Sequence, residues 1–241
     1  METWKKACSL ASFELKASWK SIFTFAIALV VVVMLIAPIF SEMGQQLKFF
    51  YDLMFLMIFI VLPSWLRKKE FQYQKIGEET WGAPYFIFLH QMAIPKEILL
   101  KSRFVNYYCF AIPFHVLFFV LLFIFSEARN AYSFGEYIVF SLIWICFGIY
   151  AGSLMPASDT GDVISNLRLA IYTILILLGI GGLFFFIHFI LGAEGIVFWS
   201  LKAAKRWPLL ASVLSVLLAI AGVKYWLHYA AKNMQKIDYF K

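Results

Sequence analysis

Residues 67–103, RKKEFQYQKIGEETWGAPYFIFLHQMAIPKEILLKSR, separate two apolar runs and decide how the chain crosses a membrane. The stretch begins with RKKE (67–70) directly after one run and ends with KSR (101–103) directly before the next. It holds seven of the 21 Lys and Arg residues, and every other connection is much shorter. Because cytoplasmic loops of membrane proteins carry an excess of Lys and Arg, we expect this loop in the cytoplasm.

The last third of the loop predicts a turn followed by a short amphipathic helix. Pro95 suits the first helical position, where its missing N–H is not needed. Ile98 and Leu99 form one apolar edge. The charged residues that face elsewhere are Lys96, Glu97 and Lys101. A short amphipathic helix held between two spans is a good docking surface for a soluble partner.

The same loop resembles that of the ABC-2-type permeases, the membrane-spanning subunits of one class of ABC transporter. The resemblance is carried by the acidic pair Glu78 and Glu79, by MAIPKEIL (92–99) and by KSR (101–103) at the start of a span. It implies a coupling helix that sits in a cleft of a separate ATPase subunit. The coupling residues it implies are Pro95, Lys96, Glu97, Ile98, Leu99, Lys101 and Arg103, with Glu78 and Glu79 as supporting contacts. The alternative is a basic loop that fixes orientation and touches lipid headgroups.

The composition excludes a soluble globular domain. The chain has 241 residues, of which 63% are hydrophobic and only 15% are charged, whereas globular proteins carry about 25% charged residues. The net charge of +7 needs no nucleic-acid partner, because the basic residues cluster at the ends of apolar runs. Three cysteines, an odd number, suggest no disulfide framework.

Six apolar runs predict an all-α membrane protein of one domain, residues 1–241, with six transmembrane helices. Each run is close to the ~20 residues that a helix needs to cross a bilayer. The runs are 21–40, 49–66, 104–125, 136–155, 169–191 and 208–229. An even number of spans puts both termini on one side, and that side carries 16 of the 21 Lys and Arg residues. We therefore expect both termini in the cytoplasm.

Residues 1–20 are too polar to span and predict an interfacial amphipathic helix. Its apolar side is formed by Trp4, Cys8, Ala11, Leu15 and Trp19, and its polar side by Lys5, Ser9, Ser12, Lys16 and Lys20. The ABC-2 permeases have a similar "elbow" helix before the first span. The alternative is a helix that extends the first span downward.

The second inner loop, residues 156–168, has the composition of a turn. Ser158 or Asp162 is a candidate cap for the next helix. Together with Asp159 these residues form either a second, smaller contact with the ATPase or a plain connector.

Residues 192–207 begin with an apolar part that is too short to cross a membrane and is flanked by Gly192 and Gly195. This pattern predicts a re-entrant or interfacial hairpin, and the resemblance implies that it closes the outer mouth of a permease. A basic cluster follows, which we expect to meet outer-leaflet phosphates or an acidic substrate or partner. Its members are Lys202, Lys205 and Arg206.

Few residues carry recognisable chemistry. No G-x-x-x-x-G-K-[ST] motif occurs, so this chain does not cradle ATP phosphates by itself, and the four histidines show no metal-ligand spacing. His115 and His188 lie deep in predicted spans, where each is expected to make a helix–helix hydrogen bond; the alternative is a proton relay. Glycines at 148–152 and 179–182 predict close helix packing, either within the chain or at a dimer seam.

These observations and the resemblance predict a non-catalytic permease subunit of a bacterial ATP-driven ABC-2 exporter in the inner (plasma) membrane. Two permease chains, identical or different, would work with two separate ATPase subunits that bind ATP and Mg²⁺, while this chain binds no cofactor. The predicted cargo is amphipathic or lipid-like: a peptide, an antimicrobial or a drug. The alternatives are a secondary carrier or intramembrane enzyme without an ATPase partner, and a membrane anchor or sensor.

Overall fold

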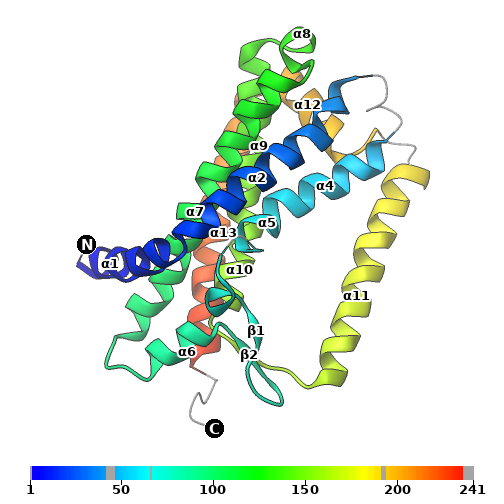
Figure 1. The fold of residues 1–241 in the computed structure, drawn as a ribbon. Helices are drawn as coiled ribbons and strands as arrows, with labels where there is room; N and C mark the ends of the chain where they lie inside the picture. Colours follow the sequence, from blue (N-terminus) through cyan, green and yellow to red (C-terminus); the bar gives the residue numbers. More distant parts are fainter. Residues whose placement is uncertain (1, 42–46, 66, 191–193, 236–241) are drawn as a thin grey trace.

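The computed structural model describes residues 2–41, 47–65, 67–190 and 194–235 (Figure 1). Gly192 and the side chain of Trp19, both named above, lie outside the described part. The described strands are β1 (Gln74–Lys75), β2 (Thr80–Gly82) and β3 (Asp162–Val163). The helices are α1 (Glu2–Ala17), α2 (Trp19–Ile36), η1 (Ala37–Phe40), α4 (Lys48–Ile60), α5 (Leu62–Trp65), η2 (Lys69–Phe71), α6 (Pro84–His90), α7 (Lys96–Phe125), α8 (Ala128–Ala131), α9 (Phe134–Gly152), α10 (Leu154–Ser158), α11 (Asn166–Phe185), η3 (Phe186–Ile190), α12 (Ile196–Arg206) and α13 (Pro208–Met234).

Five helical segments of the described chain are long and apolar enough to cross a bilayer. They are Phe23–Phe40, Lys96–Phe125, Phe134–Ser158, Asn166–Ile190 and Pro208–Met234. The protein therefore has the architecture of an all-α, multi-pass membrane protein, as the apolar runs predict.

The second predicted span, residues 49–66, differs from a single long helix. Helix α4 has 13 residues, which at 1.5 Å per residue is about 20 Å and falls short of the ~30 Å hydrocarbon core. The separate turn α5 follows Val61, and it contains Pro63, which cannot donate a backbone hydrogen bond. The second apolar run is thus a helix interrupted at Val61, and its role as a sixth span remains a prediction.

Aromatic rings hold α4 in the centre of the bundle. Phe55 of α4 lies edge-to-face against Trp144 of α9, with ring centroids 4.8 Å apart, and against Phe118 of α7, 5.8 Å apart. Phe59, one turn along α4, is 0% exposed in the same cluster. Such aromatic pairs contribute about 0.5–1.5 kcal/mol each beyond the area they bury. Packing against α7 and α9 therefore keeps this short helix inside the fold.

Two glycines allow α9 to approach its neighbours closely. A Cβ atom on Gly148 would lie 2.6 Å from Cε1 of His115, and one on Gly152 would overlap the hydroxyl of Tyr107. Both partners belong to α7. Of the two alternatives drawn from the sequence, packing within the chain is the correct one for these positions.

Helix α11 stands apart from the other long helices (Figure 1). Only 11% of its apolar window is buried, and Leu177 and Leu178 are 65% and 67% exposed. Added Cβ atoms on its glycines would meet nothing within 4 Å, which holds for Gly179, Gly181 and Gly182. Among the described residues, no other segment therefore packs closely against these three glycines.

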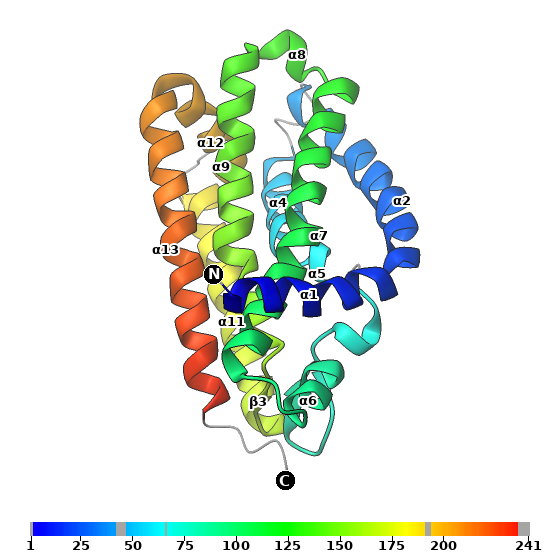
Figure 2. The ribbon, with the colours of Figure 1, turned by 90° about the vertical axis from the view of Figure 1, so that its left-hand side faces the viewer.

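The bundle has two distinct ends (Figures 1 and 2). One end carries α8, η1 and α12. The opposite end carries the three strands, α6 and the C-terminal end of α13. The connections that the sequence assigns to the outside and to the cytoplasm are thus separated in space.

Helix α1 forms where the N-terminal helix is predicted, but it buries a different face. Figure 2 shows α1 lying across α7, with which it packs. Ala11 and Glu14 are buried in this contact, whereas Trp4 is 42% exposed. Glu14 turns inward because its carboxylate pairs with Arg103 of α7, and both side chains are 0% exposed. The buried side of α1 therefore includes Glu14 and not Trp4, which corrects the predicted apolar side. The position of α1 at a membrane interface remains a prediction.

Candidate coupling platform

The two predicted inner loops fold together into one small sheet. Strands β1 and β2 pair antiparallel, with Lys75 opposite Trp81, and β2 and β3 pair antiparallel, with Trp81 opposite Asp162. The sheet order is β1-β2-β3. The backbone N–H of Ile164 extends the ladder by donating to the carbonyl of Glu79 at 2.9 Å. We call this sheet together with α6 the platform.

A buried ion pair ties both loops to the helices above them. Nη1 and Nη2 of Arg67, which follows α5, donate to the two carboxylate oxygens of Asp159, which follows α10, at 2.6 and 3.3 Å. The side chains are 2% and 0% exposed. The carbonyl of Asp159 also accepts from the N–H of Ala83 at 3.2 Å. A bidentate Arg–carboxylate pair restricts orientation as well as distance, so the platform is fixed to α5 and α10.

Helix α6 attaches the platform to α7 and α13 through apolar contacts. Phe86 and Leu89 of α6 are 0% and 3% exposed in a cluster with Leu99 and Phe104 of α7. Met234, at the end of α13, is 2% exposed in the same cluster. A displacement of α6 would therefore also move its packing partners α7 and α13.

The predicted coupling helix at 95–103 is not a separate element. Lys96 begins α7, a continuous helix of 30 residues that runs on to Phe125. No helix-breaking residue lies between Lys96 and Pro113, so nothing separates the predicted short helix from the span. The free-standing short helix of this loop is α6, with Pro84 in its first turn. The prediction that a helix begins after Pro95 is confirmed, but the prediction that it is short and separate from the span is wrong.

Burial divides the predicted coupling residues into two groups. Ile98 and Leu99 are 7% and 1% exposed, and Arg103 is occupied by Glu14, so these three serve the internal packing of α1, α6 and α7. Pro95, Lys96 and Glu97 are exposed. Only the exposed group is accessible to a partner.

Lys101 is partly buried and is held by its own chain. Its Nζ lies 2.5 Å from the Glu97 carboxylate and 3.2 Å from the Thr3 hydroxyl. The same ammonium lies 4.9 Å from the centre of the Trp4 ring. Lys101 therefore links α7 to α1, a contact that the sequence does not predict.

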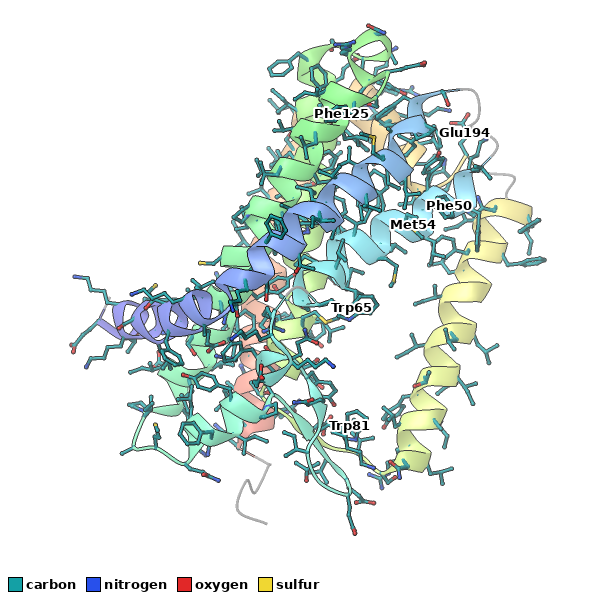
Figure 3. The ribbon with its side chains drawn as sticks, in the orientation of Figure 1. Phe50, Met54, Trp65, Trp81, Phe125 and Glu194 are labelled. Atoms are coloured by element: carbon teal, nitrogen blue, oxygen red, sulfur yellow. The ribbon has the colours of Figure 1, made fainter. Side chains whose placement is uncertain are left out.

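Glu78 and Glu79 occupy the turn between β1 and β2 and are both exposed. Trp81, labelled in Figure 3, stacks on Tyr73 across the hairpin with ring centroids 5.9 Å apart. Burial and the nearby Asp162 carboxylate raise the pKa of Tyr73 to about 12, so its hydroxyl stays protonated at neutral pH. The stacked rings stiffen the hairpin that presents the acidic pair.

The second inner loop contributes differently from its prediction. Ser158 donates its hydroxyl to the carbonyl of Leu154 at 2.9 Å, and Asp162 accepts from the N–H of Val163 at 2.8 Å, so neither caps a helix. The N-cap of α11 is Ser165. Asp159 is buried against Arg67 and offers no surface to a partner.

At the opposite end, residues 196–206 form the 11-residue helix α12, about 16 Å long and too short to cross a membrane. Lys202 and Lys205 line a pocket there. Arg206 instead lies over the ring of Trp207, 5.0 Å from its centre. The predicted basic cluster is thus divided between two surfaces.

Asp52 of α4 caps the start of α12, a role that the sequence does not predict because the two segments lie far apart in the chain. Its carboxylate accepts from the backbone N–H groups of Ile196 and Val197 at 2.7 and 2.8 Å. It also lies 3.1 Å from Nε2 of His188, in the middle of η3. A helix–helix hydrogen bond from His188 is therefore confirmed. The two free N–H groups of a helix start attract a carboxylate, but 144 residues separate Asp52 from Ile196.

Among the described residues, no three His, Cys, Asp or Glu side chains gather closely enough to hold a metal ion. The chain matches no protein-family model, no curated protein and no solved structure.

Proposed function

We propose that this chain is the membrane-spanning subunit of an ATP-driven exporter of the ABC-2 type, with separate ATPase subunits that dock on the platform. The observation that carries the proposal is the platform itself. Both inner loops form one sheet, clamped by the buried Arg67–Asp159 pair. Because the platform contacts several helices, a movement of the docked ATPase would displace those helices together. Rigid-body displacement of this kind is a common form of conformational switching.

The docking surface is assigned to α6 and the turn that leads into α7. Phe88 and Met92 are 51% and 45% exposed although both are apolar. Lys96 and Glu97, at the start of α7, are also exposed. A short helix with apolar anchors is a common ligand for a groove in a partner protein. Glu78 and Glu79 supply a second, acidic contact at the tip of the hairpin.

The proposed transport direction and cargo follow from the resemblance and from the apolar surface. Figure 3 shows Met54 and Trp65 on the side of the bundle that faces α11, and Trp65 is 62% exposed. An apolar, aromatic side of this kind suits an amphipathic or lipid-like cargo. ATP hydrolysis is placed on the partner, and no catalytic role is assigned to this chain.

Replacing Phe88 with Glu should abolish docking of the ATPase without unfolding the chain, because the side chain is half exposed and a charge removes its apolar contact. The measurement is ATP hydrolysis recovered with the tagged chain when it is purified from its native membrane. We expect at least tenfold less activity for the Phe88→Glu variant than for the unmodified chain.

The matched control is Phe134→Glu, which changes a 66% exposed Phe at the opposite end of the bundle and should leave the recovered activity unchanged. Equal activity with both variants would contradict the docking surface. If the unmodified chain recovers no ATP-hydrolysing partner, the exporter proposal fails in favour of a secondary carrier or intramembrane enzyme.

A second permease chain is proposed to pack on α11. Gly179 and Gly182 are three residues apart, so they share one helix face, and a Cβ atom added at either position would have no neighbour within 4 Å in the described part of the chain. Small residues at this spacing let two membrane helices approach closely. A second copy of α11 fits this face, whether the copy belongs to an identical or a different permease chain.

The double variant Gly179→Leu/Gly182→Leu should shift the purified protein from dimer to monomer, since two leucines separate the helices while the monomer has room for them. Light scattering coupled to size-exclusion chromatography in detergent gives the mass. Gly135→Leu is the matched control, because its Cβ also has open space around it but lies at the α8 end. A dimer that persists in the double variant would show that the seam lies elsewhere.

A further inference from the structure

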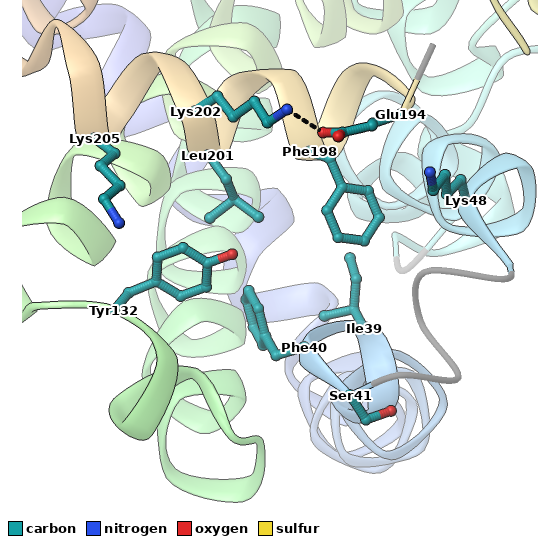
Figure 4. A pocket seen from close by; sticks show the side chains of 10 residues that line it. All are labelled: Ile39, Phe40, Ser41, Lys48, Tyr132, Glu194, Phe198, Leu201, Lys202 and Lys205. Atoms are coloured by element: carbon teal, nitrogen blue, oxygen red, sulfur yellow. Dashed lines mark ion pairs between the residues drawn. The ribbon is translucent and has the colours of Figure 1, made fainter. Parts of the chain in front are cut away.

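A pocket of about 340 Å³ lies at the end of the bundle that carries α8 and α12 (Figure 4). Four elements contribute to it: η1, the first turn of α4, the connection at Tyr132, and α12. The residues that line it are Ile39, Phe40, Ser41, Lys48, Tyr132, Glu194, Phe198, Leu201, Lys202 and Lys205. Its volume is near the lower limit of small-molecule sites, which suits a headgroup and a short apolar segment.

The inner part of the pocket is apolar. Figure 4 shows Ile39, Phe40, Phe198 and Leu201 grouped in its centre. Ile39 and Leu201 are 0% and 3% exposed, so they belong to the core of the bundle. Phe40 and Phe198 are half-buried, so a ligand that covers their rings gains by removing the remaining apolar surface from water.

The rim is positively charged. Lys202 is paired with Glu194, with Nζ and the carboxylate 2.6 Å apart, and this pair lowers the pKa of Glu194. Lys48 and Lys205 have no carboxylate within 4.0 Å among the described residues. The pocket therefore has two lysines whose charge the described chain does not neutralise directly. Figure 4 shows the hydroxyl of Tyr132 pointing inward between the rim and the apolar centre.

We propose that this pocket binds an anionic amphiphile, with its phosphate or carboxylate on the side of Lys205 and Tyr132 and the first carbons of its tail on Phe40 and Phe198, while Lys48 adds positive charge at the opposite edge. Lysine ammonium groups bind phosphate as compact point charges, and the hydroxyl of Tyr132 can donate a further hydrogen bond. The apolar centre selects against small inorganic anions. This assignment needs no ATPase partner and stands on the pocket alone.

The test uses the full chain, purified in dodecyl maltoside, and decyl phosphate as the probe in isothermal titration calorimetry. We expect saturable binding to the unmodified chain and at least tenfold weaker binding to Lys48→Gln/Lys205→Gln. The control Lys68→Gln/Lys69→Gln removes the same charge from two exposed lysines at the platform end and should bind as the unmodified chain does. Equal affinities for all three proteins would overturn the proposal.

Two further arms identify the source of the anion. Inorganic phosphate should bind at least tenfold more weakly than decyl phosphate, and equal affinity would overturn the amphiphile assignment. In nanodiscs, phosphatidylglycerol should compete with decyl phosphate if the bilayer supplies the headgroup. If the probe binds equally well in phosphatidylglycerol and phosphatidylcholine discs, the ligand is a soluble amphiphile instead. The Phe88→Glu variant should bind the probe normally, so failure of the docking surface leaves this result intact.

Discussion

Replacing Glu14 with Ala should destabilise the chain by about 3–5 kcal/mol, the usual cost of removing one partner from a buried ion pair. Arg103, left behind at 0% exposure, would have no counter-charge from α1. Asn106 would also lose the acceptor to which its side-chain amide donates. Since folded proteins are stable by only about 5–15 kcal/mol, this loss is a large part of the total.

The measurement is the free energy of unfolding in mixed micelles, titrated with sodium dodecyl sulfate. The double variant Glu14→Leu/Arg103→Met should recover most of the loss, because replacing both members of a buried pair with apolar residues is often neutral. Glu2→Ala is the control, since Glu2 forms only an exposed pair with Lys6, and such pairs contribute about 0–1 kcal/mol. A Glu14→Ala protein as stable as the control would show that α1 is not held by this pair.

Replacing Arg67 with Leu should release the platform from the bundle. Asp159 would keep a buried carboxylate without its bidentate partner, at a cost of about 3–5 kcal/mol. The effect should be concentrated in the sheet, because Asp159 also accepts from Ala83 just beyond β2. Amide hydrogen exchange should therefore accelerate most at β2 and at Ile164.

The charge-swapped variant Arg67→Asp/Asp159→Arg should restore part of the protection, because it again pairs an arginine with a carboxylate at this buried position. Lys75→Gln is the control in the same sheet, because Lys75 makes only an exposed hydrogen bond to Asn166 and its loss should cost less than about 0.5 kcal/mol. Exchange that rises uniformly over the whole chain in Arg67→Leu would contradict a local clamp. If the exporter proposal holds, the same variant should keep the ATPase bound but transport less, since docking and transmission use different residues.

The predicted helix at 95–103 shows that a sequence pattern can locate the start of a helix without determining its length. The stretch at 95–103 has an amphipathic edge and a favourable proline, so it predicts a helix, and that helix exists. It continues into the span because no helix-breaking residue follows before Pro113. Ile98 and Leu99 are buried, so they form no outward docking face. Only the packing partners distinguish a docking helix from the first turns of a longer one.

The sequence by itself determined the class of this protein. Long apolar runs predict helices that can cross a membrane, because an unpaired backbone polar group is costly in lipid and a helix satisfies its own hydrogen bonds. The same reasoning located α2, α7, α9, α11 and α13 and the helix before the first span. These features depend on neighbouring residues alone, so composition and spacing are enough to find them.

The tertiary structure alone decided which charges are buried and which are free. The pairs Glu14–Arg103 and Arg67–Asp159, and the Asp52 cap on α12, join residues that lie far apart in the sequence. The residues around a carboxylate near a predicted span end look the same in the sequence whether that carboxylate is exposed to water or buried against a partner side chain. Burial and partner geometry settle that choice, because the cost of removing a charge from water is offset only where another chain segment supplies its counter-charge or its donors.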